Sequence, residues 1–296
     1  MNSENVPELD QNRKIGEGVF EVDLELNGKN LRTYAAKCFL DETSRNREFK
    51  TLESIAKLSH DSIVTAYAKK ELGSGLIEYY CIVLELEGES MEKQLTTESP
   101  PPGYQDDLLK HIHKLIEALC CLHKLGFHYD IKPANILLKR SGSGKGYIFV
   151  DFGVFVKSGS PVRGDSGYSE YAPPPSPSGM AEGKSDVWSL ACVVLELLIW
   201  AYLGGKSALD KFRAEKKAEL EEHLRECYTS DTEHFYVQKS GRVQLNAAVD
   251  EWLGKLGNCS ETASVVPILQ KMLNVDPAER STVKEALDQF TQCIQN

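Results

Sequence analysis

The chain has 296 residues, of which 41% are hydrophobic and 26% charged, a composition that can form sizeable cores and excludes global disorder. At about 150 residues per domain, this length predicts two packing units or one larger domain with two lobes. The formal net charge of −10 opposes binding to nucleic acid and to anionic membrane surfaces, because like charges repel.

The cysteines and the apolar segments predict an intracellular protein. The eight cysteines show neither a CxxC pair nor the spacing of a secreted disulfide framework, so we expect a reducing compartment, the cytoplasm or the nucleus. Met1–Asp10 lacks the basic and apolar regions of a signal peptide. The longest apolar run, Trp188–Trp200, contains Glu196 and is shorter than the roughly 20 residues of a membrane span. It predicts a buried helix and no membrane insertion.

The first part of the chain reads as a small antiparallel sheet with one helix. Glycines and alternating apolar residues indicate short strands, and apolar residues at helical spacing indicate a helix over 46–58. The expected strands are 15–22, 24–26, 33–40, 63–72 and 77–86.

Beyond Gly88 the segments become longer and helical. Gln105–Leu125 has the apolar spacing of a strong amphipathic helix, and two short strands are expected at Ile136–Leu138 and Tyr147–Val150. The expected organisation is an N-terminal lobe at 1–84 with residues 1–12 as a tail, a hinge at 85–88, and a C-terminal lobe at 89–296.

Gly16 and Gly18 lie in a predicted strand-turn-strand. Two glycines let backbone amides approach phosphates closely, and Val22 can offer an apolar face to a base. A G-x-G turn alone is more often an ordinary hairpin, so this signal is weak without support.

Lys37 supplies that support. It ends a strand segment Tyr-Ala-Ala-Lys, a context that suits an ammonium held against phosphate oxygens. Such a lysine needs a carboxylate from the following helix. Glu48 is the first choice, because Leu52 and Ile55 follow it on one helix face, and Glu53 is the alternative.

The most specific signal is the run from His128 to Leu138. It places Asp130, Lys132 and Asn135 in one loop between a helix and a strand, where they can accept a hydroxyl proton, neutralise a moving phosphoryl group and bind Mg²⁺. Asp151 follows the next strand in an Asp-Phe-Gly tripeptide, where a carboxylate can coordinate a Mg²⁺ that bridges the phosphates.

With Lys37, Asp130, Asn135 and Asp151 in this order, the chain resembles a eukaryotic-type protein kinase catalytic domain over about residues 13–290. The resemblance implies an α+β, protein kinase-like fold with a small antiparallel N-terminal lobe and a larger, mainly α-helical C-terminal lobe. It also implies ATP and Mg²⁺ as cofactors and serine or threonine hydroxyls of a protein as substrate. Later segments that resemble the family are Tyr171–Pro174, Lys184–Leu190 and Asp276–Arg280.

The resemblance also implies roles for individual residues. The catalytic set is Asp130, Lys132, Lys37 and Glu48. The metal-binding set is Asn135 and Asp151. Leu84 resembles the family's gatekeeper, and Glu85–Glu87 would offer backbone groups to adenine. The full nucleotide-binding set is Ile15, Gly16, Gly18, Val22, Ala35, Lys37, Leu84, Glu85, Leu86, Glu87 and Leu137.

Three positions depart from the family pattern. Glu21 replaces the third glycine of the loop, which predicts a stiffer loop with a negative charge near the phosphates. Tyr129 replaces an arginine that would bind a phosphorylated activation loop. Pro174 replaces the glutamate that pairs with the arginine matched by Arg280. The expected substitute partners of Arg280 are Glu170 and Glu182, and candidate phosphorylation positions are Ser166, Tyr168 and Ser169.

An insert relative to the family is expected at about 204–257. Its helix, predicted at Ser207–Cys227, alternates charges like an exposed, solvated helix, and a docking surface is the alternative.

Three functions fit the sequence to different degrees. The first is an ATP-dependent serine/threonine protein kinase. The second is a pseudokinase scaffold, which the departures favour and the intact chemical residues oppose. The third is a small-molecule kinase of the aminoglycoside-phosphotransferase type, against which Lys132 and Phe152-Gly153 argue.

Overall fold

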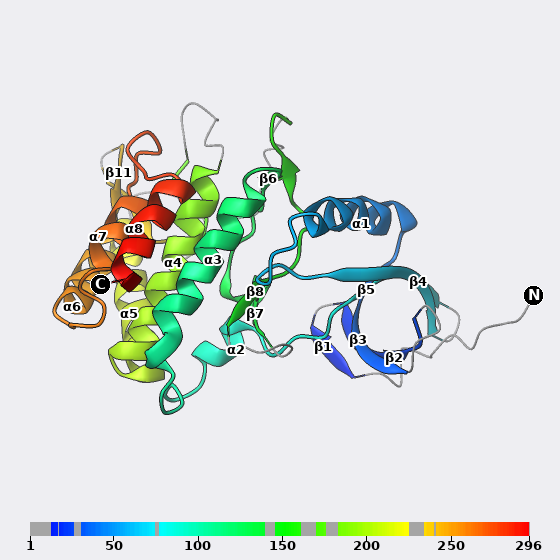
Figure 1. Cartoon of the computed structure of the whole chain (residues 1–296). Coiled ribbons are helices and arrows are strands. Elements are labelled where there is room, and N and C mark those ends of the chain that lie inside the picture. The colour runs from blue at the N-terminus through cyan, green and yellow to red at the C-terminus, as the bar shows by residue number, and fades with distance from the viewer. Residues whose placement is uncertain are drawn as a thin grey trace, which may run out of the picture.

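The computed structural model describes residues 13–16, 18–26, 31–74, 77–139, 146–160, 170–175, 183–224, 234–239 and 241–295. They form two lobes, with the sheet and α1 at one end and most helices at the other (Figure 1). The N-terminal lobe has a five-stranded antiparallel sheet in the order β1-β2-β3-β5-β4. Its elements are β1 Lys14–Gly16, β2 Val19–Leu24, β3 Arg32–Phe39, α1 Glu42–Ala56, β4 Ala66–Ser74 and β5 Ile77–Leu84.

Helix α1 begins earlier than its apolar spacing predicted. The Asp41 side chain caps the helix by accepting the backbone N–H of Ser44 at 2.8 Å, so Glu42 starts a polar first turn. Apolar periodicity could not reveal this turn, because it begins only at Phe49. The buried inner face of α1 consists of Arg45, Glu48, Thr51, Leu52 and Ile55.

The C-terminal lobe is mainly helical, and its described residues form three two-stranded sheets, β6-β9, β7-β8 and β10-β11. Its first elements are α2 Met91–Leu95, η2 Gln105–Asp107, α3 Leu108–Leu122, β6 Gly126–Phe127, η3 Pro133–Asn135, β7 Ile136–Leu138, β8 Tyr147–Phe149 and β9 Val156–Lys157. The later ones are α4 Lys184–Tyr202, α5 Gly205–Leu224, β10 Tyr236–Lys239, β11 Arg242–Leu245, α6 Ala247–Gly257, α7 Val266–Met272 and α8 Val283–Gln295.

Helix α4 forms the centre of this lobe. It is apolar and, at 19 residues, long enough to cross a membrane, but 89% of its apolar window is buried inside the fold. The predicted buried helix is therefore confirmed, and it extends beyond the apolar run Trp188–Trp200 at both ends. Among the described residues, no other helix has the length and composition of a membrane span.

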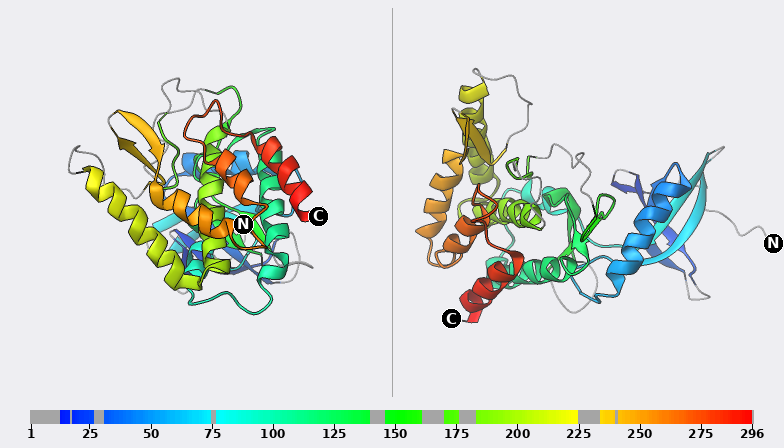
Figure 2. Two further views of the ribbon diagram at one scale, coloured as in Figure 1. Left: turned by 90° about the vertical axis from the view of Figure 1, so that its left-hand side faces the viewer. Right: turned by 90° about the horizontal axis from the view of Figure 1, so that it is seen from above.

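Helix α5 differs from the expected solvated helix. It packs beside α4 on the outer side of the lobe (Figure 2). Leu209, Phe212 and Lys216 recur at helical spacing and are fully buried, so one face of α5 belongs to the core. The alternating charges on the other face hid this packing in the sequence.

The small sheet β7-β8 positions the segments with the most specific motifs. Ile136 pairs with Phe149, and the N–H of Val150 donates to the carbonyl of Asn135 at 3.1 Å. The loop that ends at Asn135 is therefore held beside the strand that leads into Asp151.

Candidate active site

Lys37 lies at the centre of a charged cluster between the lobes. Its ammonium donates to both carboxylate oxygens of Glu48, at 2.8 and 3.0 Å, and to Oδ1 of Asp151 at 2.7 Å. The alternative Glu53 is exposed on the other side of α1. Strand β3, helix α1 and the turn after β8 thus each contribute one charged group.

The pKa directions in this cluster follow from its geometry. Burial opposes the ammonium of Lys37, but the two carboxylates outweigh burial and raise its pKa above the ordinary 10.5. Burial would raise the pKa of Asp151, but the Lys37 charge outweighs it and lowers that pKa. Burial raises the pKa of Glu48 although Lys37 opposes the change. At neutral pH, Lys37 and Asp151 are both charged.

Asp130 is fixed by two neighbours in its own loop. The Asn135 side-chain amide donates to Oδ2 of Asp130 at 2.8 Å and to its carbonyl at 2.9 Å. The Lys132 ammonium lies 2.9 Å from the same Oδ2. The carboxylate stays partly exposed, at 26%, so it can be reached by a substrate hydroxyl.

Asp186, at the start of α4, binds the backbone of this loop through hydrogen bonds. Its carboxylate accepts the N–H groups of His128 and Tyr129, both at 2.8 Å, and lies 3.1 Å from Nε2 of His123. Tyr129 has a φ of 61°, a left-handed conformation that costs a non-glycine residue about 1–3 kcal/mol. The two hydrogen bonds that the buried carboxylate accepts from this backbone compensate for the strain.

Phe152 connects the two motif segments through its ring. It is fully buried and packs on the His128 ring with centroids 4.9 Å apart. The His128 ring nitrogen Nε2 lies 3.1 Å from the carbonyl of Val150. Asp151, with a φ of 61°, turns its carboxylate in the other direction, toward Lys37. The ring contact therefore keeps this carboxylate at the cleft.

The donor types fit the expected Mg²⁺. Asp151 offers a carboxylate that is 42% exposed, and Asn135 uses its amide nitrogen toward Asp130, which leaves its amide oxygen as the end for a cation. These hard oxygen ligands, together with phosphate oxygens, are the ligands that Mg²⁺ prefers. Among the described residues, no group of three His, Cys, Asp or Glu side chains forms a metal site without substrate.

Comparison with known proteins agrees with this geometry. Residues 9–290 match the protein kinase domain. The chain belongs to this family. The expected resemblance and the α+β kinase fold are thereby confirmed.

Serine/threonine kinases are among the relatives of this kinase domain. PknB of Mycobacterium leprae is 28% identical over 212 residues, which cover 65% of this chain and 33% of that protein. RUNKEL of Arabidopsis thaliana is 29% identical over 191 residues, 62% of this chain and 13% of that protein. PrkC of Bacillus subtilis is 28% identical over 180 residues, 56% and 26% of the two chains. The kinase domain thus spans about a third or less of these relatives.

The strand pleat of the kinase domain corrects the prediction for Val22. Glu21 pairs with Ala35 and Val19 with Lys37 across β2 and β3, so these four side chains share one face of the sheet. Val22 lies on the opposite face, where it is 1% exposed and packs with Cys81, Val83 and neighbouring apolar residues. It cannot contact a base bound on the Lys37 face, so its predicted nucleotide contact is wrong.

Other predicted nucleotide residues lie on strands β1, β3, β5 and β7 and in the turn before β2. Ala35 pairs with Leu84 across β3 and β5. Ile15 is 41% exposed in the middle of β1, and Gly18 turns the chain into β2 with a φ of 63°. Leu137 forms an isolated bridge with Ser90 below the hinge. Their contacts with a nucleotide remain predictions.

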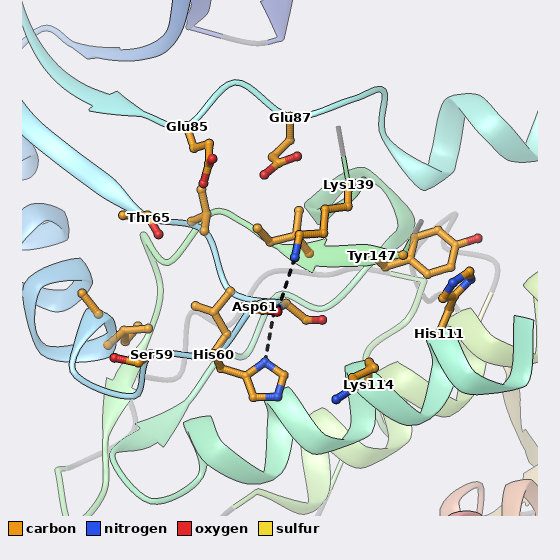
Figure 3. A pocket seen from close by; sticks show the side chains of 17 residues that line it. Ser59, His60, Asp61, Thr65, Glu85, Glu87, His111, Lys114, Lys139 and Tyr147 are labelled. Carbon is orange, nitrogen blue, oxygen red and sulfur yellow. Dashed lines mark hydrogen bonds and ion pairs between the residues drawn. The ribbon is translucent and has the colours of Figure 1, made fainter. Parts of the chain in front are cut away.

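The hinge is held close to the C-terminal lobe. The N–H of Gly88 donates to the carbonyl of Leu138 at 2.8 Å, and a Cβ at position 88 would lie only 2.7 Å from that oxygen. Only glycine fits this approach. The side chains of Glu85 and Glu87 line a cavity of about 670 Å³ together with Lys139 and Tyr147 (Figure 3). The backbone and not these carboxylates is therefore the part of Glu85–Glu87 that could serve adenine, together with that of Leu86.

Glu21 replaces a glycine on the Lys37 face. Its carboxylate lies 3.5 Å from the exposed guanidinium of Arg13. We expect Glu21→Gln to lower the KM for ATP by about 2–5-fold, because a weakly screened negative charge leaves the phosphate side of the cleft. Titration of ATP in a transfer assay measures this change.

Glu25→Gln is the matched control for that experiment. Glu25 follows β2 and lies six residues beyond Val19, the residue paired with Lys37, so its charge is about 20 Å away along the strand. An equal decrease in KM for both variants, or none for Glu21→Gln, would contradict the expectation.

Arg280 does not bind Glu170, one of the two expected carboxylates. It is 1% exposed and donates to the carbonyls of Asn274 at 2.8 Å, Lys184 at 2.9 Å and Val275 at 3.4 Å, while its guanidinium lies 5.0 Å from the Trp188 ring centre. Burial lowers its pKa to about 10. Glu170 as its partner is therefore wrong, because backbone carbonyls satisfy the guanidinium.

Four predictions fall on residues outside the described ranges: the substitute Glu182 and the phosphorylation candidates Ser166, Tyr168 and Ser169.

Sequence reasoning missed Asp186 and assigned no role to His128. Both lie inside quoted motif segments. A carboxylate that opens an apolar helix must be paired once it is buried, and this signal could have identified Asp186.

Proposed function

We propose that this chain transfers the γ-phosphoryl group of ATP to serine or threonine hydroxyls of a protein substrate. The observation that carries the proposal is the joint placement of Lys37, Glu48 and Asp151 in one bonded cluster, with Asp130 held by Asn135 and Lys132 in the adjacent loop. A pseudokinase need not retain all of these groups in bonding geometry.

Each group has a role in this proposal. The Lys37 ammonium holds the α- and β-phosphate oxygens, and Glu48 orients the lysine. Asp130 accepts the proton of the attacking hydroxyl, while Lys132 neutralises charge on the transferred group. When Mg²⁺ is bound, it neutralises phosphate charge, and Asp151 and Asn135 would hold it.

Transfer of labelled phosphate from ATP tests the proposal, with casein and lysine-rich histone as acceptors. The controls are Asp130→Asn, which lacks the base, and Lys37→Met, which lacks the phosphate-binding ammonium. Transfer by the wild type and not by the variants supports the kinase. Thermal stabilisation by ATP and Mg²⁺ without transfer to any acceptor supports the scaffold.

We also propose that the kinase activity belongs to an intracellular, reducing compartment.

Tyr129 leads to a prediction about regulation. Its side chain packs against Phe127, with ring centroids 6.0 Å apart, and carries no cation for a phosphate group. We therefore expect treatment with a phosphatase to leave the rate of transfer within about twofold of the untreated enzyme, because no guanidinium at position 129 is available to bind a phosphorylated loop. Mass spectrometry before and after treatment verifies the phosphorylation state, and abolished activity would contradict the prediction.

A further inference from the structure

A charged network around one buried carboxylate connects the insert to the segment that resembles the family's A-P-E; its cation, Arg213, is 33% exposed. Glu196, in the middle of α4, is completely buried. Arg213 of α5 binds it with two hydrogen bonds, Nε to Oε1 at 2.9 Å and Nη2 to Oε2 at 2.5 Å. The hydroxyl of Tyr171 donates to Oε2 at 2.9 Å. Paired, bidentate geometry of this kind is strong in a buried setting.

The backbone carbonyl and the ring of Tyr171 are also bound, in addition to its hydroxyl. Its carbonyl accepts the Ser189 hydroxyl of α4 at 2.8 Å, and its ring lies 5.7 Å from the Phe235 ring. Burial raises the pKa of Tyr171, so its hydroxyl remains a donor at neutral pH. Since Ala172 and Pro173 follow directly, these contacts set the position of that segment.

The same face of α5 also contacts Phe235, the aromatic neighbour of Tyr171. Lys216 lies three residues after Arg213, hence on the same side of the helix. Its ammonium is fully buried, has no hydrogen-bond partner among the described residues, and lies 3.8 Å from the centre of the Phe235 ring. Phe235 therefore neighbours both Lys216 and Tyr171.

The family's usual connection at this place is missing. Pro174 has no carboxylate, and the guanidinium of Arg280 is bound by three carbonyls and Trp188. One connection of this segment to the C-terminal lobe runs from the Tyr171 hydroxyl to Glu196, which Arg213 binds.

We propose that Arg213 is a positioning residue for binding of the protein substrate, and that it acts through Glu196 and Tyr171. This proposal rests on the proposed kinase function: Tyr171–Pro174 resembles a motif of the family, and the contact of this segment with the protein substrate is part of the proposal. The insert is then part of the substrate-binding structure, in place of a solvated helix.

Two variants and one control test the proposal in the full chain. Tyr171→Phe removes one hydroxyl and keeps the ion pair, while Arg213→Met removes the cation. Lys211→Met is the control, because Lys211 is 65% exposed on the same helix and only 3.8 Å from Glu215 in a surface pair. The KM for casein and the KM for ATP are measured separately, with the melting temperature of each variant.

We expect Tyr171→Phe, which loses one hydrogen bond to a charged group, to raise the KM for casein by about 10–100-fold. Arg213→Met loses two such hydrogen bonds and should raise it at least as much, with the KM for ATP within about twofold in both variants. Lys211→Met should change neither. Equal changes in both KM values, or no change for casein, would overturn the proposal, since a merely structural role would not separate the two substrates.

Hydrogen exchange at the amides of residues 170–172 decides the matter independently of activity, because the three prolines that follow carry no N–H. Faster exchange of these amides in Arg213→Met, with unchanged exchange in α3, supports the positioning role, and unchanged exchange at 170–172 overturns it. Absence of transfer by the wild type would contradict the proposed kinase function, and the exchange result would still show whether Arg213 holds the segment.

Discussion

Asp130→Asn is expected to lower the rate of phosphoryl transfer by about 10²–10⁴-fold, the contribution of a positioned general base. The variant is nearly isosteric, and its side-chain oxygen can still accept the amide of Asn135, which lies 2.8 Å from Oδ2 in the wild type. Lys132 and the rest of the loop stay in place, so the loss reports on proton acceptance. Steady-state kinetics with labelled ATP measures it.

The control for this experiment separates chemistry from binding. Asp130→Asn should retain the wild-type thermal stabilisation by ATP and Mg²⁺, because the Lys37 cluster does not include Asp130. Asp288→Asn, a change in a 59% exposed surface pair with Lys284, should retain full activity. A rate within tenfold of the wild type for Asp130→Asn would exclude this carboxylate as the base.

Asp186→Asn is expected to destabilise the fold by about 3 kcal/mol, the scale for breaking a buried, bonded charge. The two carboxylate oxygens accept one backbone N–H each, from His128 and Tyr129. In asparagine an NH₂ group replaces one of these two oxygens. This NH₂ group faces a backbone N–H and cannot accept it, so one buried donor loses its acceptor. Tyr129 also loses support for its left-handed backbone. Urea denaturation measures the change in the free energy of unfolding.

The matched control is Asp210→Asn. Asp210 lies on α5, is 53% exposed and pairs with Lys206 on the surface, so its replacement should change stability by less than about 1 kcal/mol. A loss for Asp186→Asn that is no larger than for Asp210→Asn would show that the loop does not depend on this carboxylate.

The same carboxylate gives a pH dependence with a defined sign. Burial would raise the pKa of Asp186, but the hydrogen bond from His123, the charges of His123 and His128 and the His128 amide lower it below the ordinary 3.8. The folded state therefore binds this proton less readily than the unfolded state. Its contribution is complete above about pH 4 and is lost as pH falls through the lower folded pKa. The stability difference between wild type and Asp186→Asn should shrink over that range in urea titrations.

The chemical centre could be predicted from sequence because its parts are local. Asp130, Lys132 and Asn135 lie within one short loop, and Asp151 directly follows a recognisable strand. The pairing of Lys37 with Glu48 also depends on which face of the helix points inward. The apolar periodicity of the helix identifies that face.

The errors arose where three-dimensional pairing decides the outcome. The place of Val22 after the glycines predicts a nucleotide contact, but one residue along a strand changes the face. The charge of Arg280 predicts a carboxylate partner, whereas the backbone carbonyls of Asn274 and Lys184 satisfy it. The buried face of α5 depends on contacts with α4 and Phe235 that no local pattern specifies.

The bonding of Arg280 has a consequence for how the domain opens. Its guanidinium is bound to carbonyls of Asn274, Val275 and Lys184, all outside the segment at 170–175. That segment can therefore detach without exposing an unpaired buried guanidinium in the C-terminal core. Local opening and global unfolding then become separate cooperative events, with the opening free energy of the segment below that of the core. Opening of the segment breaks the hydrogen bond from Tyr171 to Glu196, while the bidentate pair of Glu196 with Arg213 can persist in the core.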